Sequence, residues 1–108
     1  RKKDMIISGG FNVYPSDLEA VMRKHPAIAD VAVVGVASRA WGETPVAFVV
    51  TAPGATPSAE ELKDWANAQL GKTQRLSDLK LVDSLPRSAI GKVLKRELRE
   101  AYAANAAA

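Results

Sequence analysis

Short apolar runs, separated by glycine and polar residues, predict the strands of this 108-residue chain. Apolar, β-branched stretches cover 29–36 and 45–51, and we expect these two strands to be buried and to pair antiparallel. A shorter apolar segment at 79–82 predicts a third strand. Residues 4–14 hold two short extended segments on either side of two glycines. This pattern predicts a tight β-hairpin, because glycine adopts positive φ at little cost.

Apolar residues at helical spacing predict a first helix that begins at Pro15 and stops at His25. Proline suits the first turn of a helix, because its missing N–H would have no intrahelical partner there. Ser16 and Glu19 have the spacing of a capping box, in which each side chain bonds the other residue's backbone. We therefore expect these two residues to cap the helix.

Two further helices are predicted over 57–70 and from Lys92 to about Ala103. Helices thus alternate with strands, and no sequence repeat is present. The fold class expected is α+β: a small three-stranded sheet packed by helices, with an N-terminal β-hairpin.

Composition narrows the classes of function. The length suits a single domain with a modest core. The absence of cysteine excludes disulfides and thiolate metal sites and fits a cytoplasmic location. His25 is the single histidine and no metal-binding spacing surrounds it, so no metal site is expected. No apolar run is long enough for a membrane span. The net charge of +3 is mild and lacks the basic stripe of nucleic-acid-binding domains, so no nucleic-acid partner is expected.

The loop over 85–92 holds the strongest candidate for chemistry. Pro86 stiffens this loop, and Gly91 allows the backbone to approach another group closely. Lys92 then stands at the predicted helix start, where the helix dipole disfavours a cation. A lysine placed there indicates an anionic target, although a solvated surface lysine is the commoner meaning of such a loop taken alone.

Two long segments together carry a resemblance to a known family. The first, over 1–19, reads RKKDMIISGGFNVYPSDLE and resembles the hinge motif of the acyl-adenylate-forming (AMP-binding) superfamily, which includes acyl-CoA synthetases, peptide-synthetase adenylation domains and firefly luciferase. The second, over 85–99, reads LPRSAIGKVLKRELR and resembles the last motif of the same family. The segments 25–36 and 41–43 fall between them in the family's order. The resemblance implies that 1–108 is one small α+β C-terminal (lid) domain, and that the N-terminal domain that binds ATP and the acyl group lies outside this sequence.

The resemblance implies that the complete enzyme, most like an acyl-CoA synthetase, joins a carboxylic acid to ATP (with Mg²⁺) to give acyl-AMP, which coenzyme A then converts to a thioester. Lys92 matches the family's adenylation lysine. Lys3 and Asp4 match the hinge, and Arg1 matches a nucleotide-contacting residue. We expect the chain, which opens on Arg1, to be part of a longer protein that ends where this sequence ends. It should be inactive without its own N-terminal domain.

In this family the C-terminal domain rotates between the two steps. After rotation, Gly9 and Gly10 would leave room for the pantetheine arm of coenzyme A, and Trp41 would flank the same passage. Arg75 is a weaker candidate for the phosphates of the coenzyme.

One segment departs from the family. A basic residue and a proline are common shortly before the last strand, but Gln74 and Leu76 stand in those places here. The path of this loop and its phosphate contacts are therefore open. The identity of the acid is not encoded in the chain.

Two alternatives remain from the sequence. The chain could belong to an adenylation domain that serves a carrier protein instead of coenzyme A. It could also be an interaction module or a substrate of a lysine acetyltransferase acting on Lys92, because acetylation would remove the charge of that residue.

Overall fold

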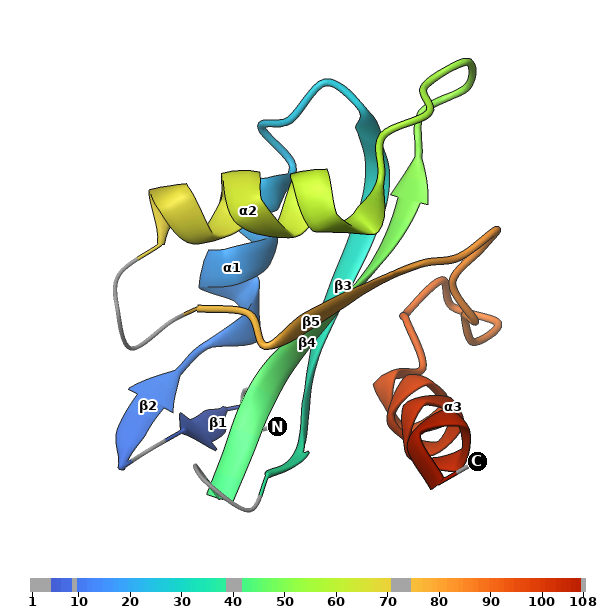
Figure 1. Ribbon diagram of the computed structural model, residues 1–108. Coiled ribbons are helices and arrows are strands. Elements are labelled where there is room, and N and C mark those ends of the chain that lie inside the picture. The colour runs from blue at the N-terminus through green and yellow to red at the C-terminus, as the bar shows by residue number, and fades with distance from the viewer. Residues whose placement is uncertain (1–4, 9, 39–41, 71–74, 108) are drawn as a thin grey trace.

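The structure is a computed structural model that describes residues 5–8, 10–38, 42–70 and 75–107. The described residues form five strands and three helices, as the ribbon in Figure 1 shows. In chain order these elements are β1 (Ile6–Ser8), β2 (Phe11–Val13), α1 (Pro15–Met22), β3 (Ile28–Ser38), β4 (Gly42–Thr51), α2 (Ala59–Gln69), β5 (Asp78–Leu81) and α3 (Lys95–Ala107). The expected α+β class, with a three-stranded sheet and an N-terminal hairpin, is confirmed.

The long antiparallel pair β3–β4 forms the centre of the sheet. Its register runs from Ile28↔Thr51 to Ser38↔Gly42, with one irregularity near the start of β3. The short strand β5 lies parallel to β4, and α2 supplies the crossover that a parallel connection requires. Among the described residues, the β1–β2 hairpin pairs with the sheet at Ser8↔Gly42, and Ile6 of β1 adds side-chain packing to this attachment.

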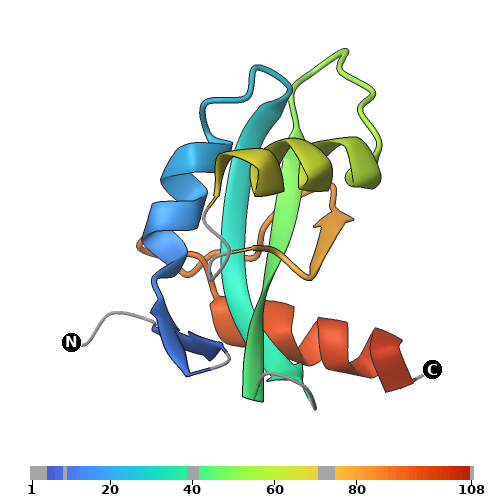
Figure 2. The same cartoon turned by 60° about the vertical axis from the view of Figure 1, so that its left-hand side comes forward.

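Helices cover both faces of the sheet. In Figure 2, α1 and α2 lie on one side of β3 and β4, and α3 crosses the other side. Because side chains alternate along a strand, Val31 and Val33 face α1 and α2, whereas Ala32 and Val34 face α3. Covering both faces explains why β3 and β4 are continuous apolar runs and not alternating ones.

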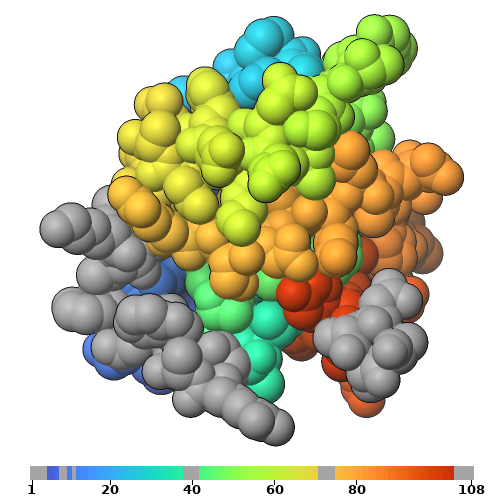
Figure 3. Space-filling model, viewed as in Figure 1, coloured from blue at the N-terminus to red at the C-terminus, as the bar shows by residue number. Residues whose placement is uncertain are grey.

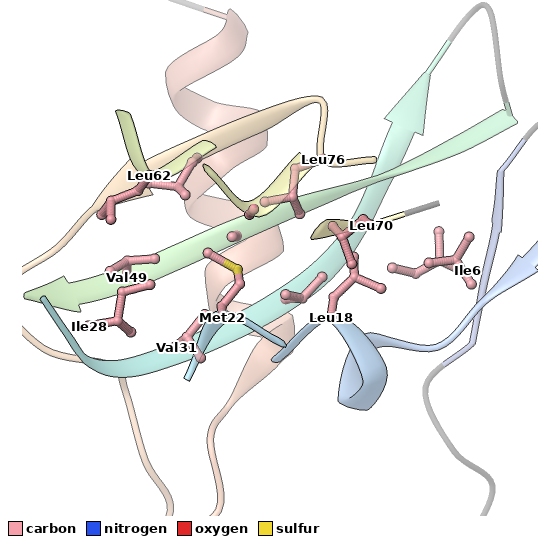
Figure 4. Close-up of a cluster of buried hydrophobic side chains, with 14 residues drawn as sticks. Ile6, Leu18, Met22, Ile28, Val31, Val49, Leu62, Leu70 and Leu76 are labelled. Atoms are coloured by element: carbon pink, nitrogen blue, oxygen red, sulfur yellow. The ribbon is translucent and has the colours of Figure 1, made fainter. Parts of the chain in front are cut away.

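The larger core cluster lies between the sheet and the helices α1 and α2 (Figure 4). Leu18, Met22, Leu62 and Val49 are completely buried there. Ile6 extends the cluster to the hairpin and lies against Gly35, where an added Cβ would come within 2.9 Å of the Ile6 side chain. The absence of a side chain at that point of β3 lets the hairpin pack closely.

The described segment before β5, residues 75–77, lies against α2. Leu76 is buried in the larger cluster. Its N–H donates to the side-chain oxygen of Asn67 (2.8 Å), and its carbonyl accepts from the same amide (3.2 Å). A proline at position 76 could not donate the first bond. Figure 3 shows α2 and this segment, in yellow and orange, in contact over the sheet; Gln74 lies outside the described residues.

Helix α1 begins at Pro15, as predicted, but its cap and the start of α2 differ from the predictions. No side-chain cap is present at α1, so the predicted capping box of Ser16 and Glu19 is wrong. Instead, α2 begins two residues later than expected and has a complete capping box, formed by Ser58 and Glu61. None of the helices in the described parts of the chain is both long and apolar enough to cross a membrane.

A hydrogen bond joins α3 to β5. The Tyr102 hydroxyl donates to the Asp78 carboxylate (2.9 Å), and the ammonium of Lys80 lies 3.6 Å from the same carboxylate. Burial would raise the pKa of Asp78, but hydrogen bonds from the Leu79 N–H and Tyr102 and the charge of Lys80 outweigh it, so this pKa lies below its ordinary value. Burial, together with the neighbouring carboxylate, raises the pKa of Tyr102.

We predict that Tyr102→Phe destabilises the domain by about 1 kcal/mol near neutral pH, because it removes one hydrogen bond to a charged acceptor. A lowered carboxyl pKa contributes stability above the ordinary pKa of 3.8 and loses it as pH falls through the folded-state value. The stability difference between the two proteins should therefore shrink below about pH 3.8. Urea unfolding of both proteins from pH 2.5 to 7 measures this difference in the free energy of unfolding. A difference that does not change with pH would contradict the role given to the Asp78 carboxylate.

Candidate functional site

The loop that carries Lys92 is a small β-hairpin. An antiparallel bridge joins Arg87 to Val93 at its base. Above the bridge, the Ser88 N–H donates to the Lys92 carbonyl (2.8 Å), and the Gly91 N–H donates to the Ser88 carbonyl (2.9 Å). Gly91 has φ +84°, the left-handed conformation of a three-residue hairpin loop closed by a glycine bulge. The glycine of the motif is therefore required by the turn itself.

The base of this hairpin is fixed by the smaller core cluster, on the α3 side of the sheet. Leu85 is buried there, and Val93 packs against it. The Leu94 N–H also donates to the Pro86 carbonyl (2.8 Å). Lys92, the neighbour of the half-buried Val93, is exposed.

The predicted helix start at Lys92 is wrong, because α3 begins at Lys95. The bridge to Val93 keeps the backbone extended for three residues longer than the sequence indicated. Lys92 therefore stands apart from the positive end of the helix.

A second lysine of the motif has the opposite environment. Lys95 is largely buried, and its ammonium lies 3.0 Å from the Glu19 carboxylate. The same oxygen of Glu19 accepts from the Val33 N–H of β3 (2.8 Å). Lys95 thus connects α3 to α1 and β3, and Lys92 is the lysine of this motif that faces solvent.

Arg87 links the hairpin to β3. Its guanidinium donates to the Gly91 carbonyl (2.8 Å) and forms an ion pair with Asp30. Asp30 also accepts from the Val31 N–H (2.9 Å) and lies 3.7 Å from Arg23. The sequence reasoning did not identify Arg87 or Asp30, and no sequence pattern connects two residues this far apart in the chain.

The other predicted site residues are described only in part. Gly10 has φ +86° at the turn between β1 and β2, which agrees with the predicted hairpin. Arg75 is exposed. The remaining predicted residues lie outside the described parts of the chain: Arg1, Lys3, Asp4, Gly9 and Trp41.

The Lys92 hairpin and the β1–β2 hairpin lie on opposite sides of the molecule. Figure 1 shows the first in dark orange at the right and the second in blue at the lower left. The first is bonded to Asp30 near one end of the β3–β4 pair, and the second joins this pair at its other end, where Gly42 faces Ser38. At about 3.3 Å per residue, the stretch of β3 from Asp30 to Ser38 is about 26 Å long. One small ligand cannot contact both hairpins at once.

A hollow of about 270 Å³ lies between β1, β3 and α3, and Lys92 is not among its lining residues. Met5, Gly35, Glu43, Lys95 and Arg99 line it, so both signs of charge are present. Within the described ranges, no group of three or more His, Cys, Asp or Glu side chains is arranged to hold a metal ion. The exposed Lys92 hairpin remains the best-defined candidate site.

Comparisons with known proteins give the family. Residues 17–92 match the sequence pattern of the AMP-binding enzyme C-terminal domain. The chain belongs to this family. Its relatives include the fatty acid–acyl-carrier-protein ligase ScoC of Streptomyces coeruleorubidus, which is 42% identical over 94% of the chain and 20% of that protein. The 2-succinylbenzoate–CoA ligase of Geobacillus kaustophilus is 42% identical over 92% of the chain and 20% of its own length.

The fold comparison agrees. The ATP-bound structure of MatB from Rhodopseudomonas palustris matches with a TM-score of 0.87 and 39% identity, over 94% of this chain and 20% of that one. This C-terminal domain therefore spans about a fifth of the length of the relatives it matches.

We predict that Gly91→Ala destabilises this C-terminal domain by about 1–2 kcal/mol, the cost of the left-handed conformation for a residue with a side chain. An added Cβ meets nothing within 4 Å, so the cost arises in the backbone alone. Urea unfolding measures this loss of stability. Hydrogen exchange at the Ser88 amide should also accelerate, because the hydrogen bond from this amide to the Lys92 carbonyl loosens.

Gly54 provides a matched control. It has φ +82° and equally open surroundings, but it lies in the loop before α2. Gly54→Ala should cost a similar amount of stability and leave local exchange at Ser88 unchanged. A Gly91→Ala variant as stable as the parent would show that the turn tolerates another conformation.

Proposed function

We propose that this domain is the mobile C-terminal part of a carboxylic acid–CoA ligase and that Lys92 is its adenylation lysine. The observation that carries the proposal is the contrast between two lysines of one motif. Lys92 is exposed on a hairpin that is held by its own hydrogen bonds, whereas Lys95 is largely buried and is paired with Glu19. The position of Lys92 in the resembling motif supports the same choice.

The reaction explains why a lysine is needed. A carboxylate oxygen attacks the α-phosphorus of ATP, the bond to the β-phosphate oxygen breaks, and pyrophosphate leaves with that electron pair. Two anions approach each other, and negative charge accumulates between them. A positioned ammonium lowers this barrier by electrostatic stabilisation. Lys92 would keep its protons throughout and act through its charge.

The second step uses a different surface. The thiol sulfur attacks the acyl carbonyl, AMP leaves, and the thiol proton passes to solvent. We propose that the domain rotates about Lys3 and Asp4, so that Lys92 withdraws and the β1–β2 hairpin, with Gly9 and Gly10, meets the pantetheine arm. The separation of the two hairpins along about 26 Å of β3 supports this rotation, because one small site cannot receive both hairpins in a single orientation.

Other residues complete the proposal from the family resemblance. Arg1 would contact the nucleotide, Trp41 would flank the pantetheine passage, and Arg75, which is exposed, would contact phosphates of the coenzyme. ATP, with Mg²⁺, and the acid would bind mainly to an N-terminal domain.

Lys92→Ala in the complete enzyme should lower the rate of acyl-adenylate formation about 100- to 1,000-fold, the usual cost of removing one group that stabilises developing charge. Thioester formation from supplied acyl-AMP should change less than about twofold. The acid is first found by screening fatty acids, 2-succinylbenzoate and substituted benzoates for pyrophosphate release, and the two half-reactions are then measured separately.

Lys24→Ala is the control, because Lys24 is also exposed but lies just after α1, outside the Lys92 hairpin. Both half-reactions should keep their rates in this variant. Equal losses in the two half-reactions of Lys92→Ala, or no loss in either, would sink the proposed role.

A carrier protein is the second candidate acceptor, because the relative ScoC is named as an acyl-carrier-protein ligase. We expect coenzyme A to be the better acceptor, as it is named for the Geobacillus relative. The complete enzyme is given acyl-AMP and either coenzyme A or a phosphopantetheinylated carrier protein, and thioester formation is followed. Faster transfer to the carrier protein would reverse the assignment of the acceptor without affecting the role of Lys92.

The exposure of Lys92 also suits modification by a lysine acetyltransferase, which would remove its charge and stop adenylation. The family and the relatives above do not support such a partner, so acetylation stays a prediction from the sequence.

A further inference from the structure

Both peptide groups that flank the Cα atom of Lys92 are held by hydrogen bonds. The peptide before it is held through the Gly91 carbonyl, which accepts from the guanidinium of Arg87 at 2.8 Å. The peptide after it is held through its own carbonyl, which accepts from the Ser88 N–H at 2.8 Å. Together these bonds fix the direction in which the Lys92 side chain leaves the backbone.

Arg87 also ties this turn to the sheet. The second arm of its guanidinium pairs with the carboxylate of Asp30. Asp30 is itself fixed, because its other oxygen accepts from the Val31 N–H at 2.9 Å within β3. The hairpin that carries Lys92 is therefore bonded to the central strand pair, and not only to its own base.

The chemistry of the side chain matters here. A guanidinium has several N–H groups in a rigid plane and can bond a carbonyl and a carboxylate at the same time. A lysine at position 87 has a single flexible ammonium, so holding both partners would require a less favourable geometry. The carboxylate adds charge to the bond, which strengthens it relative to a neutral acceptor.

From this geometry we infer that Arg87 and Asp30 are positioning residues for the adenylation step: they hold the Lys92 hairpin against β3, so that the ammonium enters the partner domain's site in a defined direction. The inference rests on the proposed role of Lys92. Neither residue needs to touch the substrate. Their contribution is preorganisation, since a misplacement of about 1 Å in a catalytic group costs up to about 100-fold in rate.

The test uses the complete enzyme with the acid identified by the screen above. Arg87→Leu removes both bonds and should lower the single-turnover rate of adenylate formation about 10- to 100-fold. The KM for ATP and the rate of thioester formation from supplied acyl-AMP should each change less than about twofold. Arg87→Lys should fall between Arg87→Leu and the parent enzyme. A loss of general stability would instead lower both half-reactions together.

Asp30→Asn tests the anchor on the sheet. It keeps the side-chain shape and the acceptor for Val31 but removes the charge, and it should also slow adenylation selectively. Arg87→Leu combined with Asp30→Asn should be no slower than Arg87→Leu alone, because both changes break one linkage. Multiplied losses in the double variant would overturn the idea of a single linkage through Asp30.

Arg23→Gln is the matched control. The guanidinium of Arg23 also lies 3.7 Å from the carboxylate of Asp30. It donates to the carbonyl of Val31 in β3, whereas the guanidinium of Arg87 donates to the Lys92 hairpin. Adenylation by this variant should match the parent. A selective loss in Arg23→Gln as large as that in Arg87→Leu would overturn the inference, as would an unchanged adenylation rate in Arg87→Leu.

Lys92→Ala, measured alongside, separates this inference from the proposed function. If Lys92→Ala abolishes adenylation and Arg87→Leu does not, only the positioning role fails. If Lys92→Ala leaves adenylation intact, the proposed function itself fails.

Discussion

The antiparallel pairing of β3 with β4 is the constraint on which the rest of this domain depends. Its two faces are both buried, one by α1 and α2 and the other by α3. Its two ends carry different surfaces: the Lys92 hairpin is bonded to Asp30 near one end, and the β1–β2 hairpin joins at Gly42 near the other. In the rotation proposed above, this strand pair would carry both hairpins together, because each is bonded to one of its ends.

Much of the fold could be predicted, because burial on both faces leaves a strong trace in the sequence. Continuous apolar runs identified β3 and β4, and two adjacent glycines identified the N-terminal hairpin. Helix starts were harder, as two Ser-x-x-Glu patterns show. Ser58 and Glu61 form a capping box, but Ser16 and Glu19 do not. Ser16 lies inside α1, whose N-cap is Tyr14, and Glu19 is bonded to partners distant in sequence.

Those partners are the N–H of Val33 on β3 and the ammonium of Lys95 on α3. A capping side chain must turn back to its own helix end, and Glu19 instead points to the sheet. The same limit applies to the candidate site. The motif indicated Lys92, but the contact between Arg87 and Asp30 joins residues 57 positions apart, and only the folded chain brings them together. A sequence motif can indicate a candidate residue such as Lys92, but it does not show which distant residues are bonded to the hairpin that carries it.

The corrected start of α3 also removes an electrostatic conflict. A lysine in the first turn of a helix faces the positive end of the helix dipole, which disfavours its charge. That position belongs to Lys95, and the carboxylate of Glu19 lies 3.0 Å from its ammonium. Lys92 stands three residues earlier, on a hairpin whose own hydrogen bonds fix its backbone. The two lysines of the motif therefore differ in their surroundings. Lys95 is largely buried and is paired with Glu19, which helps to hold α3 in place, whereas Lys92 is exposed, as its proposed role toward an anionic reaction centre requires.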